Sequence, residues 1–242
     1  MAKPSSQGKS RRNRQSAQER RISHLRRGIV IGICLVVFGV AIGGLLYSAG
    51  SVDVDDIVEG EHYEVVADAP RRRPGAPVTV TEFFSYGCVH CRTFDPLIED
   101  WRRDLSEGAA FERVPVAFSL EWAILGQAYL ALERTGALAQ NHERLFRAIH
   151  DNGRQFLSAS QLARFVDGHG ISGQDFLAAY NSPEVRQVLA RNEARQSRLG
   201  IASVPSLTVA DKYRINMDVG RRQALEVADH LVALEQAGPK PE

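Results

Sequence analysis

Cysteine is scarce in this chain, which has three cysteines among 242 residues. A small secreted scaffold held together by disulfides would use more cysteines over longer loops, so that class of protein is excluded. Cys88 and Cys91 form the only close pair, while Cys34 lies alone in an apolar stretch. The chain is long enough to fold around its own hydrophobic core, so the pair is better explained by reactivity than by structural need.

Charged residues are missing from residues 28–49, a run of 22 residues. A helix of that length spans roughly 33 Å, which matches the hydrocarbon core of a bilayer. Residues 1–27 carry nine Lys or Arg and one acid. The acidic residues that follow the run are Asp53, Asp55, Asp56 and Glu59. The sequence therefore predicts a transmembrane helix with the basic tail in the cytoplasm.

A cleaved secretory signal is the alternative for this segment, but its apolar region is shorter, about 7–15 residues. The length of the run favours an uncleaved single-pass anchor in the inner (cytoplasmic) membrane. In either case residues 50–242 face an oxidising compartment, which is the periplasm in a double-membraned bacterium.

The remaining sequence predicts an α/β fold after an acidic linker at residues 50–60. Strands are expected at 62–66, 78–84, 111–118, 204–209 and 212–216, with a helix from Cys88 past Trp101 and another over 221–236. Apolar residues recur at helical spacing through 121–199, which predicts four or five helices and no strand. Pro115 indicates an edge or irregular position for its strand, because proline has no N–H to donate.

Cys88 lies where a predicted strand gives way to a predicted helix. The N–H groups of a first helical turn lack partners and the helix dipole is positive there, so a thiolate at Cys88 is stabilised and reactive. Cys91 lies three residues later on the same helix face, so the two sulfurs can meet and one thiol can resolve a mixed disulfide formed by the other. His90 can add a positive charge or a hydrogen-bond donor. The motif predicts redox chemistry.

Metal binding and a purely structural disulfide account for the cysteine pair less well. A zinc site needs two more ligands, and residues 50–242 hold no further cysteine. A structural disulfide across two residues would restrain the unfolded chain very little. A non-catalytic module that binds copper or docks clients is a further alternative. Cys88, Cys91 and His90 could hold copper(I), but no methionine-rich or histidine-rich segment supports such a role. The histidines of the helical stretch, expected to be surface or capping residues, are His142, His150 and His169.

The segment Phe83-Phe84-Ser85-Tyr86-Gly87-Cys88-Val89-His90-Cys91 resembles the active-site segment of DsbA-type thiol oxidases of the thioredoxin superfamily. The resemblance covers about residues 58–236. It implies a thioredoxin fold, with a thioredoxin-like domain formed by 61–118 and 201–238 and an inserted α-helical domain at 119–200.

The resemblance also implies roles for individual residues. Cys88 is expected to be the exposed nucleophile and Cys91 its buried partner. Pro205 is expected to be a cis-proline that faces the pair, with the substrate backbone beside Val204 and Pro205. The family's buried acidic residue matches Glu82.

Arg113, on the following strand, is a candidate partner for Glu82, which needs one if it is buried. Glu82, Val89 and His90 are expected to tune the thiolate. The dipeptide Val89-His90 departs from the Pro-His of the best-studied oxidases, so Val89 is the motif position that leaves the oxidising strength open.

The expected activity is that of a thiol:disulfide oxidoreductase that introduces disulfides into exported proteins. No metal and no cofactor is expected beyond a redox-active Cys88–Cys91 disulfide. The expected partners are unfolded or reduced exported proteins, a DsbB-like quinone-linked membrane oxidase, and the membrane itself through residues 28–49, with no nucleic acid. A membrane-anchored reductase or isomerase is the redox alternative, although isomerases usually carry a dimerisation domain, for which residues 50–60 are too short.

Overall fold

The computed structural model describes residues 31–40, 57–73 and 75–238. The chain divides into two units, Met1–Ser51 and Val52–Glu242. In the first unit the described residues, 31–40, are helical and their side chains are exposed.

The predicted basic tail lies outside the described residues, as do both ends of the predicted membrane span 28–49 and most of the linker 50–60. Across the parts of the chain that the structure describes, no helix combines the length and the apolar character needed to cross a membrane.

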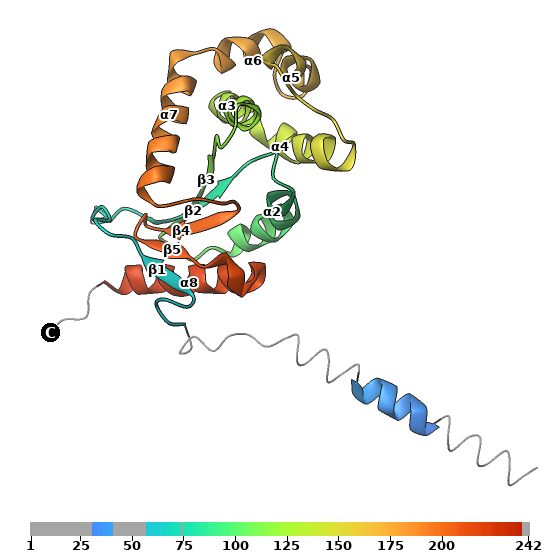
Figure 1. Ribbon diagram of the computed structural model, residues 1–242, viewed down its shortest axis with the longest axis vertical. Helices are drawn as coiled ribbons and strands as arrows, with labels where there is room; N and C mark the ends of the chain where they lie inside the picture. The colour runs from blue at the N-terminus through green and yellow to red at the C-terminus, as the bar shows by residue number, and fades with distance from the viewer. Residues whose placement is uncertain (1–30, 41–56, 74, 239–242) are drawn as a thin grey trace, which may run out of the picture. The chain divides into compact units, whose positions relative to one another are not determined.

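A five-stranded mixed sheet lies at the centre of the second unit, in the order β1-β5-β4-β2-β3 (Figure 1). Its strands are β1 (Tyr63–Val65), β2 (Val78–Phe84), β3 (Ala109–Pro115), β4 (Ser206–Val209) and β5 (Tyr213–Ile215). β2 and β3 run parallel, and the other neighbours are antiparallel. All five predicted strands are confirmed, and β3 is the edge strand that Pro115 indicates. β3 ends at Pro115 rather than at Phe118, because Ser119 already caps the next helix.

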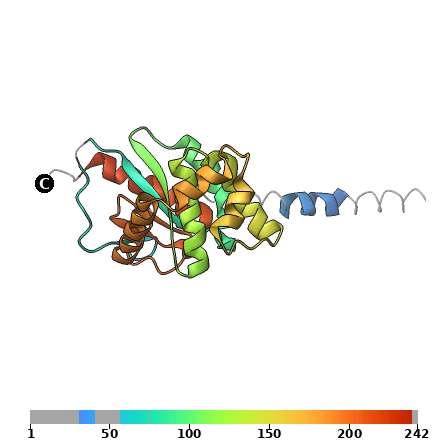
Figure 2. The same cartoon turned by 90° about the horizontal axis from the view of Figure 1, so that it is seen from above.

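Five α-helices connect β3 to β4, which confirms the predicted helical stretch (Figures 1 and 2). They are α3 (Leu120–Arg134), α4 (Leu138–Phe146), α5 (Ala159–Val166), α6 (Gly173–Tyr180) and α7 (Pro183–Arg198). Four of them begin after a serine whose hydroxyl accepts a backbone N–H, a standard N-cap. These serines are Ser119, Ser158, Ser172 and Ser182. The remaining α-helices of this unit are α2 (Val89–Trp101) and α8 (Arg221–Ala237).

One face of the sheet packs against α2 and α8. Val78 and Val80 of β2 form a buried cluster with Ile98 of α2 and Leu231 of α8. Because side chains alternate along a strand, Glu82 points to the same face as Val78 and Val80. The strand therefore places a carboxyl group under α2.

A second core fills the space between the helical block α3–α7 and the end of β2. It contains Phe84, Tyr86, Cys88 and Cys91 together with apolar side chains from the block. Phe84 and Tyr86 contact each other edge to face, with ring centroids 5.3 Å apart. The cysteine pair therefore lies at the border between the sheet and the helical block.

The packing of α8 predicts that replacing two of its leucines by alanine lowers the free energy of unfolding by different amounts. Leu231 is fully buried and Leu234 is 44% exposed. Leu231→Ala is expected to lower the free energy of unfolding by about 2–5 kcal/mol, because it removes buried methyl groups and leaves a cavity. Leu234→Ala, the control, should change it by less than about 0.5 kcal/mol. Urea unfolding of the full chain measures both, and equal losses would contradict this packing.

Candidate active site

Cys88 is the N-cap residue of α2, with an extended backbone at φ −93° and ψ 116°. Its sulfur accepts a hydrogen bond from the backbone N–H of Cys91 at 3.3 Å. The sulfur thus takes the place of the oxygen that Ser, Thr or Asp usually presents at this position. The unpaired N–H groups and the positive end of the helix dipole lie next to it, as its position between strand and helix predicts.

These contacts lower the pKa of Cys88 from 9.0 to about 6. The hydrogen bond from the Cys91 side chain contributes most, and burial opposes it. Backbone hydrogen bonds from Cys91 and His90 and the charge of His90 lower the pKa further. Cys88 is therefore mainly a thiolate at pH 7. Its side chain is more covered than the resemblance implies, with 7% of the residue exposed.

Cys91 has the opposite environment. It is fully buried on the inner face of α2. Burial raises the pKa of Cys91 far above its usual range, and the hydrogen bond to Cys88 and the charges of Cys88 and Glu82 raise it further. The two thiols therefore differ strongly in acidity, although they lie three residues apart.

Val204 and Pro205 lie opposite Cys88, where β4 begins. The Cys88 sulfur is 3.4 Å from the carbonyl oxygen of Val204. The Val204–Pro205 peptide bond is cis, as the resemblance implies. Both residues are half-buried.

The two residues between the cysteines point away from the core. Val89 is 53% exposed, and His90 is exposed as well. The Nδ1 atom of His90 lies 3.4 Å from a guanidinium nitrogen of Arg221, the first residue of α8. Sequence patterns gave no sign of this contact, because it joins positions 131 residues apart.

Glu82 and Arg113 form a buried ion pair below α2. The register of β2 and β3 places them side by side, and Nε of Arg113 donates to Glu82 at 2.7 Å. Burial raises the pKa of Glu82 to about 7, because it outweighs the lowering by Arg113. The negative charges of Asp95 and Glu99 raise it further. The structure thus brings Glu82 and Arg113 together as the sequence suggested.

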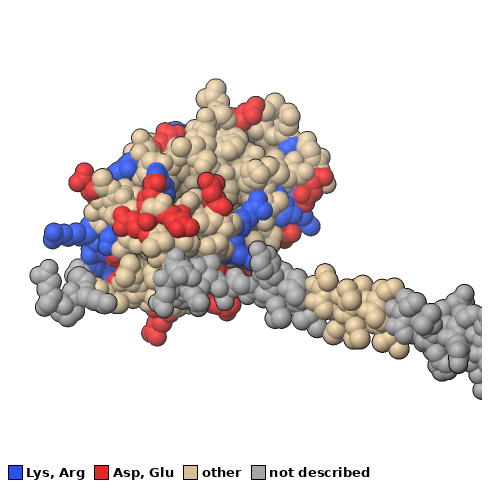
Figure 3. All heavy atoms as spheres, turned by 60° about the horizontal axis from the view of Figure 1, so that its bottom comes forward, with Lys and Arg blue, Asp and Glu red and all other residues tan. Residues whose placement is uncertain are grey.

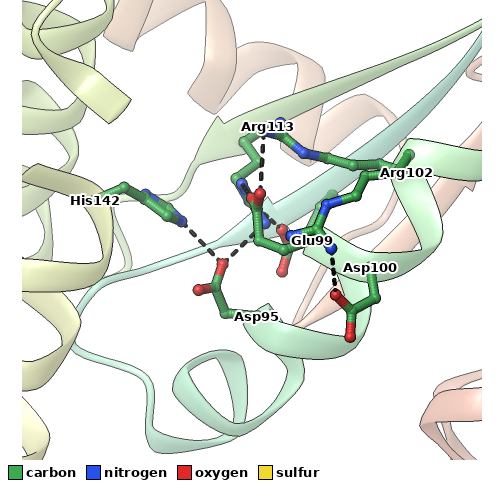
Figure 4. A network of polar contacts seen from close by, with 8 residues as sticks. Asp95, Glu99, Asp100, Arg102, Arg113 and His142 are labelled. Carbon is green, nitrogen blue, oxygen red and sulfur yellow. Dashed lines mark hydrogen bonds and ion pairs between the residues drawn. The ribbon is translucent and has the colours of Figure 1, made fainter. Parts of the chain in front are cut away.

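Arg113 is shared by three carboxylates (Figure 4). Besides Glu82, it donates to Asp95 at 2.9 Å and to Glu99 at 2.7 Å. Asp95 lies four residues after Cys91, on the same buried face of α2. The spacing is visible in the sequence, but it identifies Asp95 as a member of the buried network only when the inner face of the helix is known.

His142 extends this network from the helical block. Its Nε2 lies 2.9 Å from Asp95 and its Nδ1 lies 2.8 Å from the hydroxyl of Tyr86. The expectation that His142 is a surface or capping residue is wrong, since only 8% of it is exposed. His150, which was also expected to be a surface or capping residue, is partly buried, and its Nε2 lies 2.8 Å from the carbonyl oxygen of Tyr86. Helical periodicity did not reveal these contacts, because they depend on how α4 docks.

Asp95, Glu99 and His142 bring three possible metal-ligand atoms within 4.8 Å of one another. Arg113 already donates to both carboxylates, and a guanidinium repels a cation. These residues are therefore described as an ion-pair network rather than as a metal centre.

Gly87, the residue before Cys88, is fixed by a close approach. A Cβ atom added there would lie 2.5 Å from the indole nitrogen of Trp122 on α3. Trp122 in turn packs on Phe118, with ring centroids 5.7 Å apart. An aromatic surface thus lies against the turn that precedes Cys88, and sequence reasoning missed it.

The hydrogen bond from Cys91 predicts how the acidity of Cys88 responds to substitution. Alkylation of the reduced full chain by iodoacetamide should rise with a midpoint near pH 6. Cys91→Ala removes the side-chain donor and should raise the midpoint by about one unit or more. Cys91→Ser keeps a donor and should stay closer to the wild-type value. Thiolate absorbance at 240 nm gives the same titration, and a wild-type midpoint near 9 would refute this account.

Comparison with known proteins identifies the family. The model of the DSBA-like thioredoxin domain matches residues 98–232. The thiol:disulfide interchange protein DsbA of Azotobacter vinelandii is 35% identical over 214 residues, which cover 87% of this chain and 99% of that protein. The corresponding protein of Pseudomonas aeruginosa strain PAO1 is 31% identical over 193 residues, which cover 78% of this chain and 91% of its own.

Comparison with solved structures points to the same family. The crystal structure of Pseudomonas aeruginosa DsbA has a TM-score of 0.72 at 31% identity and covers 77% of this chain and 98% of its own. The oxidoreductase DsbA of Xylella fastidiosa has a TM-score of 0.71 at 30% identity, over 75% of this chain and 99% of its own. With the fold, the cysteine pair and these relatives in agreement, the chain belongs to the DsbA family of thioredoxin-fold proteins and is a thiol:disulfide oxidoreductase.

Proposed function

We propose that this enzyme oxidises pairs of thiols in exported proteins, with Cys88 as the nucleophilic sulfur and Cys91 as its buried partner. The observation that carries the proposal is the difference between the two sulfurs. Cys88 is a stabilised thiolate at the start of α2, whereas Cys91 is buried and holds its proton. Such a pair favours the reduced form of the enzyme and so makes its disulfide an oxidant.

The first step is attack on the Cys88–Cys91 disulfide. A substrate thiolate attacks the sulfur of Cys88, a mixed disulfide forms, and Cys91 leaves as a thiolate. Val204 and Pro205 are proposed to hold the substrate backbone, since the Val204 carbonyl lies 3.4 Å from the attacked sulfur.

The second step releases the product. A second substrate thiolate attacks the substrate sulfur of the mixed disulfide, and Cys88 leaves as a thiolate. A leaving thiol of low pKa departs faster, so a Cys88 pKa near 6 favours this step. Two electrons have then passed from the substrate dithiol to the enzyme, whose cysteine disulfide serves as its redox group without a further cofactor or metal.

Glu82 is proposed to supply the proton that Cys91 needs when it leaves. A thiolate with a strongly raised pKa takes a proton at once if a donor is near. With a pKa of about 7, Glu82 is close to half protonated at neutral pH and can exchange protons in both directions. Glu82 lies on the sheet face that packs against α2, and Cys91 lies on the buried face of that helix. The charge of Glu82 is one of the causes that raise the pKa of Cys91.

Val89 and His90 are proposed to adjust the oxidising strength from the exposed side. The charge of His90 lowers the pKa of Cys88, whereas Val89 adds no charge or donor. The redox alternative is a reductase or isomerase. The other alternative is a copper-binding module with the same fold. The reductase alternative requires a potential near −270 mV, as in thioredoxin, while an oxidant lies near −120 mV.

The anchor and the compartment complete the proposal. Residues 28–49 are proposed as a single membrane anchor, with residues 1–27 in the cytoplasm and the catalytic domain in the periplasm. Acidic and basic side chains lie interspersed on the face of the described domain that Figure 3 shows, which favours attachment through the apolar segment over attachment by surface charge there. A DsbB-like quinone-linked membrane oxidase is the proposed acceptor of the electrons.

The second unit is proposed to contain two domains. Residues 61–118 and 201–238 are proposed as the thioredoxin-like domain, and residues 119–200 as the inserted helical domain. The clients are proposed to be unfolded or reduced exported proteins, and nucleic acid is not among the expected partners.

Trapping of mixed disulfides tests the roles of the cysteines. Cys91→Ala is expected to accumulate covalent complexes with exported proteins, because the Cys88 thiolate can attack a disulfide of such a protein and expel one of its thiolates. No Cys91 thiol then remains to displace the bound protein from Cys88. Cells that express the variant are quenched in acid, and complexes are identified after non-reducing electrophoresis. The control is the double variant Cys88→Ala, Cys91→Ala, which should trap nothing. Capture through Cys34, or complexes dominated by cytoplasmic proteins, would contradict the proposal.

The acidity of Cys88 also predicts a pH-dependent difference in stability between the two redox forms. Folding lowers the pKa of Cys88, so the thiolate stabilises the reduced protein fully above pH 9 and ceases to do so as the pH falls through about 6. At pH 7 the contribution is about 1.4 kcal/mol, since one pKa unit corresponds to that energy. Urea unfolding of the reduced and oxidised full chain from pH 5 to pH 8 should show that the reduced form becomes more stable relative to the oxidised form as the pH rises. A constant difference would contradict the prediction.

A further inference from the structure

His142 is a buried titratable residue to which the exchange steps give no role. It belongs to α4 in the helical block, yet its imidazole points toward Asp95 on α2 (Figure 4). Contacts from the following residues keep α4 in place. His150 contacts the backbone of Tyr86, and Asp151 forms an ion pair with Arg92 of α2 at 3.0 Å. The segment therefore contacts α2 at Arg92 and Asp95, and the turn before α2 at Tyr86.

The hydrogen bonds fix the tautomer of His142. An ionised Asp95 can only accept, so Nε2 of His142 must carry the hydrogen that is donated to it. Nδ1 is then the acceptor for the hydroxyl of Tyr86. Burial lowers the pKa of His142, so the imidazole is neutral in this arrangement. A neutral donor stabilises Asp95 without adding a positive charge to the network.

Asp95 depends on that donor. Burial alone raises the pKa of Asp95, but the hydrogen bond from His142 and the charges of Arg113 and Arg92 outweigh it and lower the pKa. Asp95 also borders a pocket of about 710 Å³, together with Glu99, Arg113 and His142. Without the histidine, the carboxyl group has room to turn away from Arg113 and toward the pocket.

Glu82 is affected by where Asp95 lies. Both carboxylates share Arg113, and the charge of Asp95 is one of the causes that raise the pKa of Glu82. A contact made by the helical block is thus connected, through Asp95 and Arg113, to Glu82, whose charge acts on Cys91.

We propose that His142 is a positioning residue for disulfide exchange, which holds Asp95 against Arg113 and so keeps Glu82 able to protonate the departing Cys91. The inference rests on the proton-donor role of Glu82 given under the proposed function. It adds that the helical block takes part in the chemistry of the buried cysteine through His142.

The test is the pH dependence of the reduction of the oxidised full chain by glutathione, measured by stopped flow. Attack of glutathione on Cys88 expels Cys91, which is the step that needs the proton. After correction for the thiolate fraction of glutathione, the wild-type rate should fall as Glu82 loses its proton, with a midpoint near pH 7.

Two substitutions separate the two nitrogen atoms of His142. The side-chain amide that His142→Gln introduces can replace Nε2 and still donate to Asp95, so the midpoint should stay at the wild-type value. His142→Asn places its amide nearer Nδ1 and loses the donor to Asp95, so the midpoint should move to lower pH by about half a unit, in the direction given by the lost charge of Asp95. The protonated fraction at pH 7 then falls from about one half to about one quarter, which makes the rate about twofold lower.

Three further variants complete the set. Asp95→Asn removes the charge itself and should shift the midpoint in the same direction and further, while Tyr86→Phe removes only the far hydrogen bond and should leave it unchanged. Glu82→Gln should abolish the inflection. Thermal unfolding of each oxidised variant accompanies the kinetics, because a purely structural histidine would lower stability without moving the midpoint.

The outcomes are distinct. If Glu82→Gln abolishes the inflection but His142→Asn keeps the wild-type midpoint, the role of His142 is refuted and the role of Glu82 stands. If His142→Gln shifts the midpoint as far as His142→Asn, the donor to Asp95 is not the cause and the inference fails. An inflection that survives Glu82→Gln overturns the role of Glu82 and the inference with it.

Discussion

The sulfur of Cys88 accepts the N–H of Cys91 in the first turn of α2, and the rest of the site acts on the charge that this contact stabilises. Lowering the pKa of Cys88 from 9.0 to about 6 corresponds to about 4 kcal/mol in favour of the thiolate. A helix dipole supplies about 0.3–1 kcal/mol, and up to about 2 in the best geometries. The hydrogen bonds from Cys91 and His90 must therefore contribute at least as much as the dipole. Placement of Cys91 one turn later is thus part of what makes Cys88 reactive.

The surroundings of Cys91, the buried cysteine, disfavour a thiolate instead of stabilising one. Arg113 is a single cation that contacts three carboxylates, so the group carries an excess of negative charge when all of them are ionised. A buried excess of this kind is costly, and the protein reduces it by holding a proton on Glu82 near neutral pH. The same negative potential disfavours a thiolate at Cys91. One sulfur is stabilised as an anion and the other as a thiol, which is the asymmetry that directed exchange requires.

Sequence patterns predicted the parts of this protein that depend on local physics. The strands, the helical stretch and the start of α2 follow from period, capping and β-branched runs, and the motif spacing brought Cys88 and Cys91 together. Glu82 and Arg113 could be paired because they lie on consecutive strands, although only the register shows them side by side. His142 and Trp122 could not be found in this way, since their contacts cross from the helical block to α2 and Gly87. His142 was even assigned to the surface, because its helix shows which residues share a face but not what that face touches.

The location of those missed contacts explains why a helical block between β3 and β4 matters for the chemistry. In the proposed exchange, Cys88 reacts with clients while Cys91 keeps its proton away from bulk water. The helical block places Trp122 against Gly87, in the turn that precedes Cys88, and buries Tyr86 of the same turn in its own apolar cluster. Covering polar groups requires partners for them, and His142 and His150 provide these at Asp95 and at the Tyr86 carbonyl. The polar contacts of the block are therefore a physical consequence of burying one cysteine while leaving its neighbour reactive.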